Sequence, residues 1–198
     1  MKKIIAMAVG LVILFSCASA SEVETALPFG LKVGDSFDHV ADIMTGLFGE
    51  GEVEESNISK RITYHPEHIN ICGLEIRYVY LSGNTYTGKK YDICTIGIYF
   101  DADDLLETKD FSKIFILYDS LCSIMGSPES SSHVITSIDL LGNITNGSIF
   151  KRPEDFEKEV FDNLETEIKE TWENAELTVK TDKFLTSCDI DLDIYVSK

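Results

Sequence analysis

Residues 177–196 read LTVKTDKFLTSCDIDLDIYV and carry the strongest fold signal in this chain of 198 residues. Apolar residues in the second half of the stretch alternate with polar ones, the period of two that is typical of a half-buried strand. If Asp182 and Lys183 form a two-residue turn, Leu177 lies opposite Cys188. The apolar residues of both strands then share one face, so we expect a β-hairpin at this end of the chain.

Three earlier stretches alternate in the same way and extend the expected sheet. Their alternating residues are Ile62 and Tyr64; Cys72, Leu74, Ile76, Tyr78 and Tyr80; and Cys94, Ile96, Ile98 and Phe100. Such alternation is common in antiparallel sheets with one buried and one solvated face. A turn at residues 82–84 would place Cys72 opposite Cys94. A wider loop through residues 88–90 would separate them, and the sequence leaves both alternatives open.

Two helices are predicted from apolar residues that recur at helical spacing. The first follows Asp35 and Ser36, which are candidate capping residues, and ends at Gly49. The second runs from about residue 110 to residue 125 and ends at Gly126. A weaker strand is expected after the second helix.

A third helix is predicted over residues 153–174, between the weaker strand and the final hairpin. Pro153 suits the first turn of a helix. Apolar residues recur every four positions through this segment, with charged residues on the other faces: Phe156, Val160, Leu164, Ile168 and Trp172.

Together these elements predict an α+β fold with helices packed on an antiparallel β-sheet. The first two helices end alike, in Leu47-Phe48-Gly49 and Ile124-Met125-Gly126, which lie 77 positions apart. A strand is expected after each, so we expect two related helix-plus-sheet units, residues 31–108 and 109–198, that share one core. A chance match over a few residues is the alternative.

Residues 32–40, KVGDSFDHV, together with the helix end at residues 47–49, resemble the opening of the SmpA/OmlA outer-membrane lipoproteins of the barrel-assembly machinery. Residues 121–126, followed by Pro128, resemble the helix ending of the same group. The related beta-lactamase-inhibitor-protein architecture also repeats helices on an antiparallel sheet. The resemblance implies a protein-binding envelope module without catalysis, although a shared fold does not establish a shared function.

The first twenty residues have the three parts of a secretory signal peptide. Two lysines precede an uncharged apolar run at residues 4–15, and Ala18-Ser19-Ala20 matches the small-x-small cleavage pattern. The run is too short to span a bilayer, which disfavours the alternative of a retained anchor. We therefore expect an exported protein, periplasmic, surface-anchored or extracellular, with residues 1–20 removed and residues 21–30 as a tether.

A second kind of processing is an alternative within the same leader. Leu14-Phe15-Ser16-Cys17 resembles the lipobox of bacterial lipoproteins, with Phe15 in place of the usual small residue. Lipidation of Cys17 would anchor the protein to a membrane. Later apolar stretches are interrupted by charges, so we expect membrane contact only through such an anchor.

The chain is strongly acidic, with 17 basic and 34 acidic residues. Removal of the leader leaves 15 basic residues and a net charge of −19. Phosphate binding needs clustered Lys and Arg, so nucleic acid is not expected as a partner. The simplest interpretation of this charge is that it keeps an exported protein soluble.

Four cysteines follow the leader: Cys72, Cys94, Cys122 and Cys188. An even number in an exported chain permits two disulfides. Buried free thiols are the alternative, because each cysteine lies on the apolar face of its element. The spacing contains no C-x-x-C pair, so a zinc site is not expected.

Two polar stretches are candidate cation sites. His65-Pro66-Glu67-His68 offers two imidazoles and a carboxylate, but Pro66 indicates a turn rather than the helix that would bring both rings together. Residues 101–104, with Glu107, lack the glycine and spacing of a calcium loop, so helix capping is favoured. We therefore expect no bound metal and no cofactor.

Outward-facing strand residues are candidates for a binding surface. The last strand carries three aspartates on its outward face: Asp189, Asp191 and Asp193. They are suited to a cation or a basic partner, but a charged face that discourages edge pairing is favoured. Candidate exposed aromatic residues are Tyr86, Tyr91 and Tyr99.

No motif in the chain indicates catalysis. It contains no Gly-x-Ser-x-Gly, no Gly-rich phosphate loop, and no Ser or Cys tied by motif to a histidine. We therefore expect a non-catalytic protein that binds another envelope or extracellular protein through a sheet face or a loop. The alternatives are a secreted small-ligand or calcium-binding protein, or an unrecognised hydrolase, which would need a deep pocket with convergent polar groups.

Overall fold

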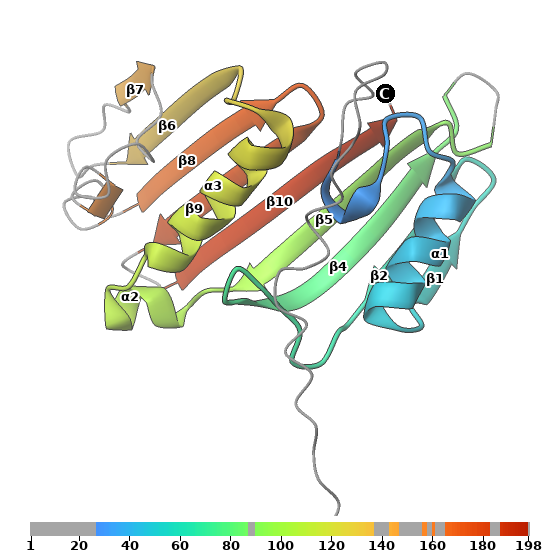
Figure 1. The fold of residues 1–198 in the computed structure, drawn as a ribbon, viewed down its shortest axis with the longest axis horizontal. Coiled ribbons are helices and arrows are strands. Elements are labelled where there is room, and N and C mark those ends of the chain that lie inside the picture. Colours follow the sequence, from blue (N-terminus) through green and yellow to red (C-terminus); the bar gives the residue numbers. More distant parts are fainter. Residues whose placement is uncertain are drawn as a thin grey trace, which may run out of the picture.

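A ten-stranded antiparallel sheet organises the residues that the structure describes (Figure 1). This computed structural model describes residues 27–86, 90–136, 143–146, 156–157, 160, 165–182 and 187–197. The predicted signal peptide and the candidate lipidation residue Cys17 lie outside the described residues. Of the predicted tether, the last four residues are described, and they include the 3-10 turn η2 (Pro28–Gly30).

The sheet joins strands from both halves of the chain. The strands are β1 (Glu52–Glu55), β2 (Ser59–Tyr64), β3 (Asn70–Ile71), β4 (Leu74–Asn84), β5 (Ile93–Asp101), β6 (Ser130–Thr136), β7 (Asn143–Asn146), β8 (Glu165–Trp172), β9 (Ala175–Asp182) and β10 (Ser187–Ser197). Their order across the sheet is β1-β2-β4-β5-β10-β9-β8-β6-β7, and β3 pairs with β4. The central pair is therefore β5 and β10, which come from opposite halves of the chain.

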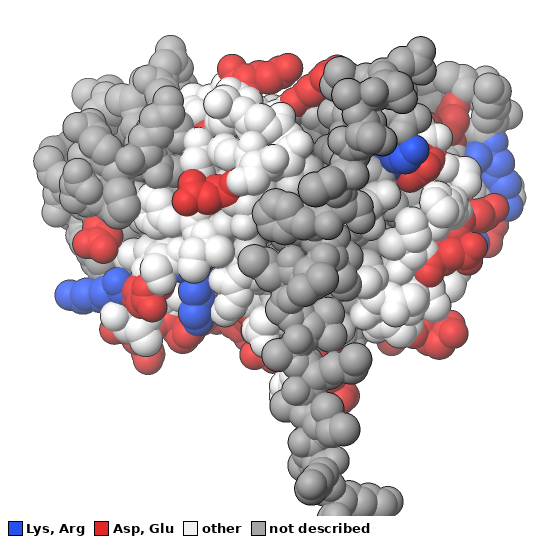
Figure 2. Space-filling model, in the orientation of Figure 1, with Lys and Arg blue, Asp and Glu red and all other residues white. Residues whose placement is uncertain are grey.

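Helices lie on one face of this sheet. They are α1 (Phe37–Phe48), α2 (Asp104–Thr108) and α3 (Ser112–Met125). Figure 1 shows α1 in front of the β1 and β2 end and α3 in front of β8 and β9. Ring contacts agree with this view, because the ring centroid of Phe48 lies 6.3 Å from that of Tyr64, and that of Tyr118 lies 6.1 Å from that of Trp172. This helix-covered side presents scattered acidic side chains between uncharged ones (Figure 2).

The mixed α+β class and the first two predicted helices are confirmed. The Oγ of Ser36 accepts a hydrogen bond from the backbone N–H of His39, as the predicted cap requires. The described part of the expected weaker strand is β6. In the part of the chain that the structure describes, no helix is long and apolar enough to cross a membrane.

The final hairpin is confirmed, but its predicted two-residue turn is wrong. Leu177 pairs with Leu192 rather than with Cys188. Strand β9 ends at Asp182 and β10 begins at Ser187, so the connection is longer than two residues. The register differs from the predicted one by four residues. A shift by an even number leaves every side chain on its original face. The predicted face of β10 is therefore buried as expected: Cys188, Ile190, Leu192, Ile194 and Val196.

The third predicted helix is wrong over its second half, where residues 165–172 form β8. Apolar residues four apart, such as Ile168 and Trp172, share a face in a strand as well as in a helix, because four is a multiple of the strand period of two. Both are buried in β8. Phe156 and Val160 are in helical conformation and buried, whereas residues 153–155, 158–159 and 161–164 of that prediction lie outside the described residues.

The four cysteines that the structure describes are free thiols. The wider of the two predicted loops joins β4 to β5, and Cys94 pairs with Gly83, so Cys72 does not face it. Cys94 and Cys188 are fully buried, whereas Cys72 and Cys122 are half-buried. Burial raises the pKa of Cys94 and of Cys188 to about 12, which keeps both thiols protonated at neutral pH.

The common ending of α1 and α3 yields a test of the fold. Gly49 has φ 85° and ψ −167°, and Gly126 has φ 83° and ψ −168°. A residue with a Cβ costs on the order of 1–3 kcal/mol in this backbone region. Gly49→Ala is expected to lower the free energy of unfolding by about 1–2 kcal/mol. Urea unfolding followed by circular dichroism measures the change.

Gly46→Ala is the matched control, because Gly46 lies inside α1 and an added Cβ there meets no atom within 4 Å. It is expected to stabilise the protein by about 0.5–1 kcal/mol, since alanine is the better helix former. Equal effects of the two substitutions would contradict the described helix end.

Candidate protein-binding surface

The sheet face opposite α1 and α3 is named the open face. A β-bulge between Ile76 and Tyr78 decides which residues of β4 reach it. Beyond the bulge, Val79 and Leu81 are buried, whereas Tyr78 and Tyr80 point to the open face and are half-buried. The predicted alternation, which placed both tyrosines on the face of Ile76, is wrong because the bulge inserts one residue and reverses the pattern.

Tyr80 spans the middle of the open face. Its hydroxyl donates a hydrogen bond to Oδ1 of Asp193 on β10 over 3.0 Å, although β5 lies between the two strands. The ring crosses β5 at Gly97, where a Cβ would collide with it. The guanidinium carbon of Arg61 on β2 lies 4.5 Å from the Tyr80 ring centroid. One connected row of side chains thus crosses four neighbouring strands.

A second aromatic group lies beside this row. The rings of Tyr78 and Tyr99 stack with centroids 4.3 Å apart and an interplanar angle of 15°. Tyr99 also contacts Tyr80 at 5.8 Å, and the ring of His65 lies 6.4 Å from that of Tyr78. Contacts on several sides restrict the rotamers of these rings, so their arrangement is set before any partner binds.

Sequence reasoning found part of this group and missed the rest. It named Tyr99 as a candidate aromatic residue, and the structure places Tyr99 on the open face. It missed Tyr78 and Tyr80 as surface residues. The available signal was Val79 and Leu81, which are out of phase with the earlier apolar residues of β4 and indicate a bulge.

The predicted role of the three β10 aspartates as edge protection is wrong, because β10 is a central strand paired with β5 and β9. Each aspartate instead has its own environment on the open face. Asp189 lies 4.0 Å from Arg77, and Asp193 accepts the hydrogen bond from Tyr80. Asp191 lies between Tyr99 on β5 and Thr178 on β9 in the strand register.

Burial raises the carboxyl pKa of both Asp191 and Asp193, but within the described residues only Asp193 accepts a hydrogen bond, from Tyr80, that opposes the rise. Burial, followed by the negative charge of Asp189, raises the pKa of Asp191 to about 6. Lys180 on β9 partly opposes this rise. Among the residues that the structure describes, none makes a hydrogen bond or an ion pair with the carboxylate of Asp191. The middle of the open face therefore holds a half-buried carboxylate beside a tyrosine ring.

Six of these residues form one continuous group on the open face, the tyrosine–aspartate surface. Its members are Arg61, Tyr78, Tyr80, Tyr99, Asp191 and Asp193. They come from β2, β4, β5 and β10, so the surface exists only when the two halves of the chain pair.

Arg77 forms ion pairs with three aspartates at one end of the open face. Its guanidinium lies 3.5 Å from Asp101 and 3.3 Å from Asp103, as well as near Asp189. These side chains are about half exposed, so the ion pairs contribute little stability. Their effect is to orient the charges at this end of the surface.

The two polar stretches considered as cation sites have other partners. His68 lies 3.6 Å from Glu75, and both line a shallow open hollow together with Arg77. Asp104 begins α2, but Asp103 before it makes no side-chain cap; its Oδ1 accepts a hydrogen bond from the Cys188 backbone N–H. Within the described ranges, no group of three or more His, Cys, Asp or Glu side chains is arranged to hold a metal ion.

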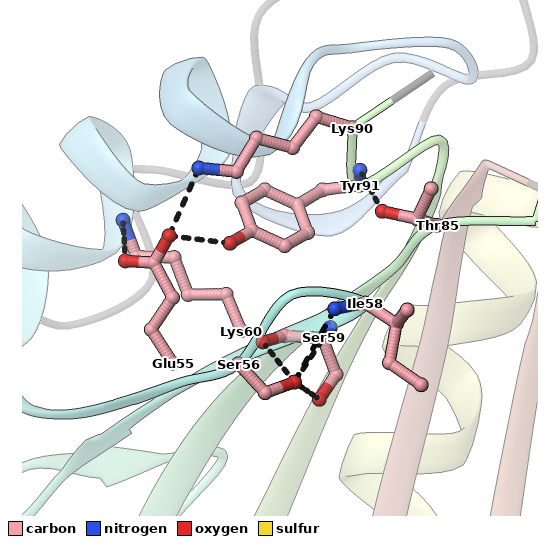
Figure 3. A network of polar contacts seen from close by, with 8 residues as sticks. All are labelled: Glu55, Ser56, Ile58, Ser59, Lys60, Thr85, Lys90 and Tyr91. Carbon is pink, nitrogen blue, oxygen red and sulfur yellow. Dashed lines mark hydrogen bonds and ion pairs between the residues drawn. The ribbon is translucent and has the colours of Figure 1, made fainter. Parts of the chain in front are cut away.

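The other two candidate tyrosines lie away from the open-face surface. Tyr86 is 81% exposed in the loop after β4. Tyr91 is buried, so its predicted exposure is wrong: its ring packs on Phe37, and its hydroxyl donates to Glu55 over 2.6 Å (Figure 3). The hydrogen bonds from Tyr91 and then Lys90 lower the pKa of Glu55. Tyr91 therefore fastens the β4–β5 loop to β1.

Comparisons of the chain with family models, with curated proteins and with solved structures find no match.

Gly97→Ala tests the crossing of Tyr80 over β5. The added methyl group displaces the ring and breaks the hydrogen bond to Asp193, so we expect a loss of about 1–3 kcal/mol in the free energy of unfolding. In the double variant Gly97→Ala/Tyr80→Ala, the ring that the methyl group would strike is gone. The two single losses should therefore add to more than the loss of the double variant. Simple additivity in urea unfolding would contradict the contact.

Asp191→Asn tests the environment of the central carboxylate. The raised pKa means that folding favours the protonated form, so the folded state loses stability as the pH rises from about 4 through about 6. The asparagine variant has no carboxyl group at this position and therefore does not lose this stability as the pH rises. Its melting temperature, relative to the parent protein, should rise between pH 4 and pH 7.5. Asp119→Asn, at an exposed position of α3, should show no such trend. A difference that is independent of pH would contradict the described burial.

Proposed function

We propose that this chain is an exported, non-catalytic envelope protein that binds another protein through the open face of its sheet. The observation that carries the proposal is the tyrosine–aspartate surface. Tyrosine and arginine are enriched in protein interfaces, where they supply large contact areas with polar ends. A fixed group of tyrosine rings beside one arginine is therefore suited to contact with a protein.

The construction of this surface supports a binding role over a purely structural one. Tyr78 and Tyr80 reach the open face because of the bulge in β4, and Tyr80 lies flat because position 97 is glycine. A glycine inside a central strand weakens the strand and often marks a close approach of another group. Here it accommodates a ring that remains half-exposed on the surface.

We also propose that the fold consists of two related units with a shared core. Each unit would contain one helix followed by strands that lead from an edge of the sheet to its centre, α1 to β5 and α3 to β10. The nearly equal backbone angles of Gly49 and Gly126 support this proposal, as does the central pairing of β5 with β10. Such an arrangement would create one broad face from two small ones.

The export part of the proposal rests on the leader sequence. Residues 1–20 have the charge, apolar run and cleavage pattern of a signal peptide. Periplasmic, surface-anchored and extracellular locations remain alternatives, and lipidation at Cys17 would select the anchored one. A strongly acidic surface is compatible with each of them.

Site-specific photo-crosslinking in the native host tests the binding proposal. The full chain, with its leader, carries a benzophenone amino acid in place of Tyr78 on the open face. A matched variant carries it in place of Ile116, which is 49% exposed on α3. We expect one discrete crosslinked protein from position 78 and none from position 116. The same products from both positions, or a product from position 116 alone, would overturn the proposed face.

A further inference from the structure

The three β10 aspartates differ in their hydrogen-bond and ion-pair partners within the chain. Asp189 has the guanidinium of Arg77 at 4.0 Å, and Asp193 has the hydroxyl of Tyr80 at 3.0 Å. For Asp191 the described residues provide neither an ion pair nor a hydrogen bond. It lies between the other two on the same face of a central strand, in register with Tyr99. A half-buried carboxylate in this position gains most from an external cation.

The neighbouring row shows how this face receives a cation. The guanidinium of Arg61 lies over the ring of Tyr80, and the hydroxyl of that ring donates to Asp193. The Tyr80 ring thus contacts a guanidinium of the same chain at its face and a carboxylate at its hydroxyl. Tyr99 and Asp191 repeat the ring and the carboxylate one step along the strands. Rings of tyrosine attract cations through their faces, most strongly when the contact excludes water.

Charge selects the kind of partner for the open face. Its acidic side chains include Glu75, Asp101, Asp189, Asp191, Asp193, Glu176 and Glu167, and its basic ones Arg61, Arg77, Lys169 and Lys180. Lys169 and Lys180 are already paired, with Glu176 at 3.0 Å and with Glu167 at 3.4 Å. The excess of acidic over basic side chains therefore lies at the centre of the open face, on β10. An acidic partner would be repelled there.

We infer that the protein partner presents a basic segment, and that an arginine or lysine side chain of this segment binds between Tyr99 and Asp191. The inference rests on the proposed function, since it specifies the chemistry of the protein that the open face binds. The guanidinium or ammonium group lies against the ring of Tyr99 and pairs with the carboxylate of Asp191. Asp193 and Tyr78 border the contact.

Fluorescence anisotropy with defined peptides tests the inference. The probes are a fluorescein-labelled peptide of alternating glycine and arginine and a matched peptide with glutamate in place of arginine, each added to protein from residue 21 onward. The arginine peptide should bind and the glutamate peptide should not. Asp191→Asn should weaken the binding of the arginine peptide about fivefold or more, because it removes the carboxylate that pairs with the guanidinium.

Matched variants separate this contact from general attraction by an acidic protein. Asp119→Asn removes the same charge from an exposed position of α3 and should weaken binding less than twofold. Tyr99→Phe keeps the ring and should retain binding, whereas Tyr99→Leu should weaken it. Equal losses in the Asp191 and Asp119 variants would overturn the inference, as would loss in Tyr99→Phe equal to that in Tyr99→Leu.

The two proposals fail in different ways. If peptide binding ignores Asp191 while position 78 still yields a crosslinked protein, the basic contact is wrong and the proposed binding face stands. If position 78 yields no crosslink, the proposed face itself is wrong, whatever the peptides do. Asp191→Asn is expected to stabilise the fold at neutral pH. A native circular dichroism spectrum and an undiminished melting temperature of this variant therefore exclude unfolding as the cause of any loss of peptide binding.

Discussion

The antiparallel pairing of β5 with β10 is the interaction on which the rest of the structure depends. It joins Ile96 to Ile194 and Ile98 to Leu192 along the centre of the sheet, and all four side chains are buried. Strands from the first half of the chain lie on one side of this seam and strands from the second half on the other. Without the seam, each half would be a small sheet covered by a single long helix, α1 or α3, with an incomplete core.

The same seam also sets the chemistry of the open face. Side chains alternate across a sheet, so burial of the apolar residues of β5 and β10 requires that Tyr99, Asp191 and Asp193 point the other way. Two local departures from regularity then complete the surface. The bulge in β4 turns Tyr80 outward, and Gly97 allows its ring to reach the next strand but one. Core packing and surface chemistry therefore follow from one set of register constraints.

Much of the fold could be predicted from local sequence patterns, and the failures have identifiable physical causes. The helix from Phe37 to Phe48 was predicted because its cap, apolar spacing and terminal glycine agree. Residues 165–172 were mispredicted because a spacing of four suits both strand and helix. The candidate surface was only partly predictable. Pairing between distant strands places Tyr80 in contact with both Arg61 and Asp193, and no local pattern encodes such contacts.

Hydroxyl-radical footprinting with mass spectrometry tests most directly whether the open face is free in the isolated protein and covered by a partner. The purified protein is oxidised alone and after addition of envelope extract from its native host. If the open face is the binding surface, Tyr78 and Tyr99 are modified in the isolated protein and protected by the extract, while the exposed Tyr86 is modified equally in both. Unchanged modification of Tyr78 and Tyr99, with protection confined to Ile116 on α3, would contradict it.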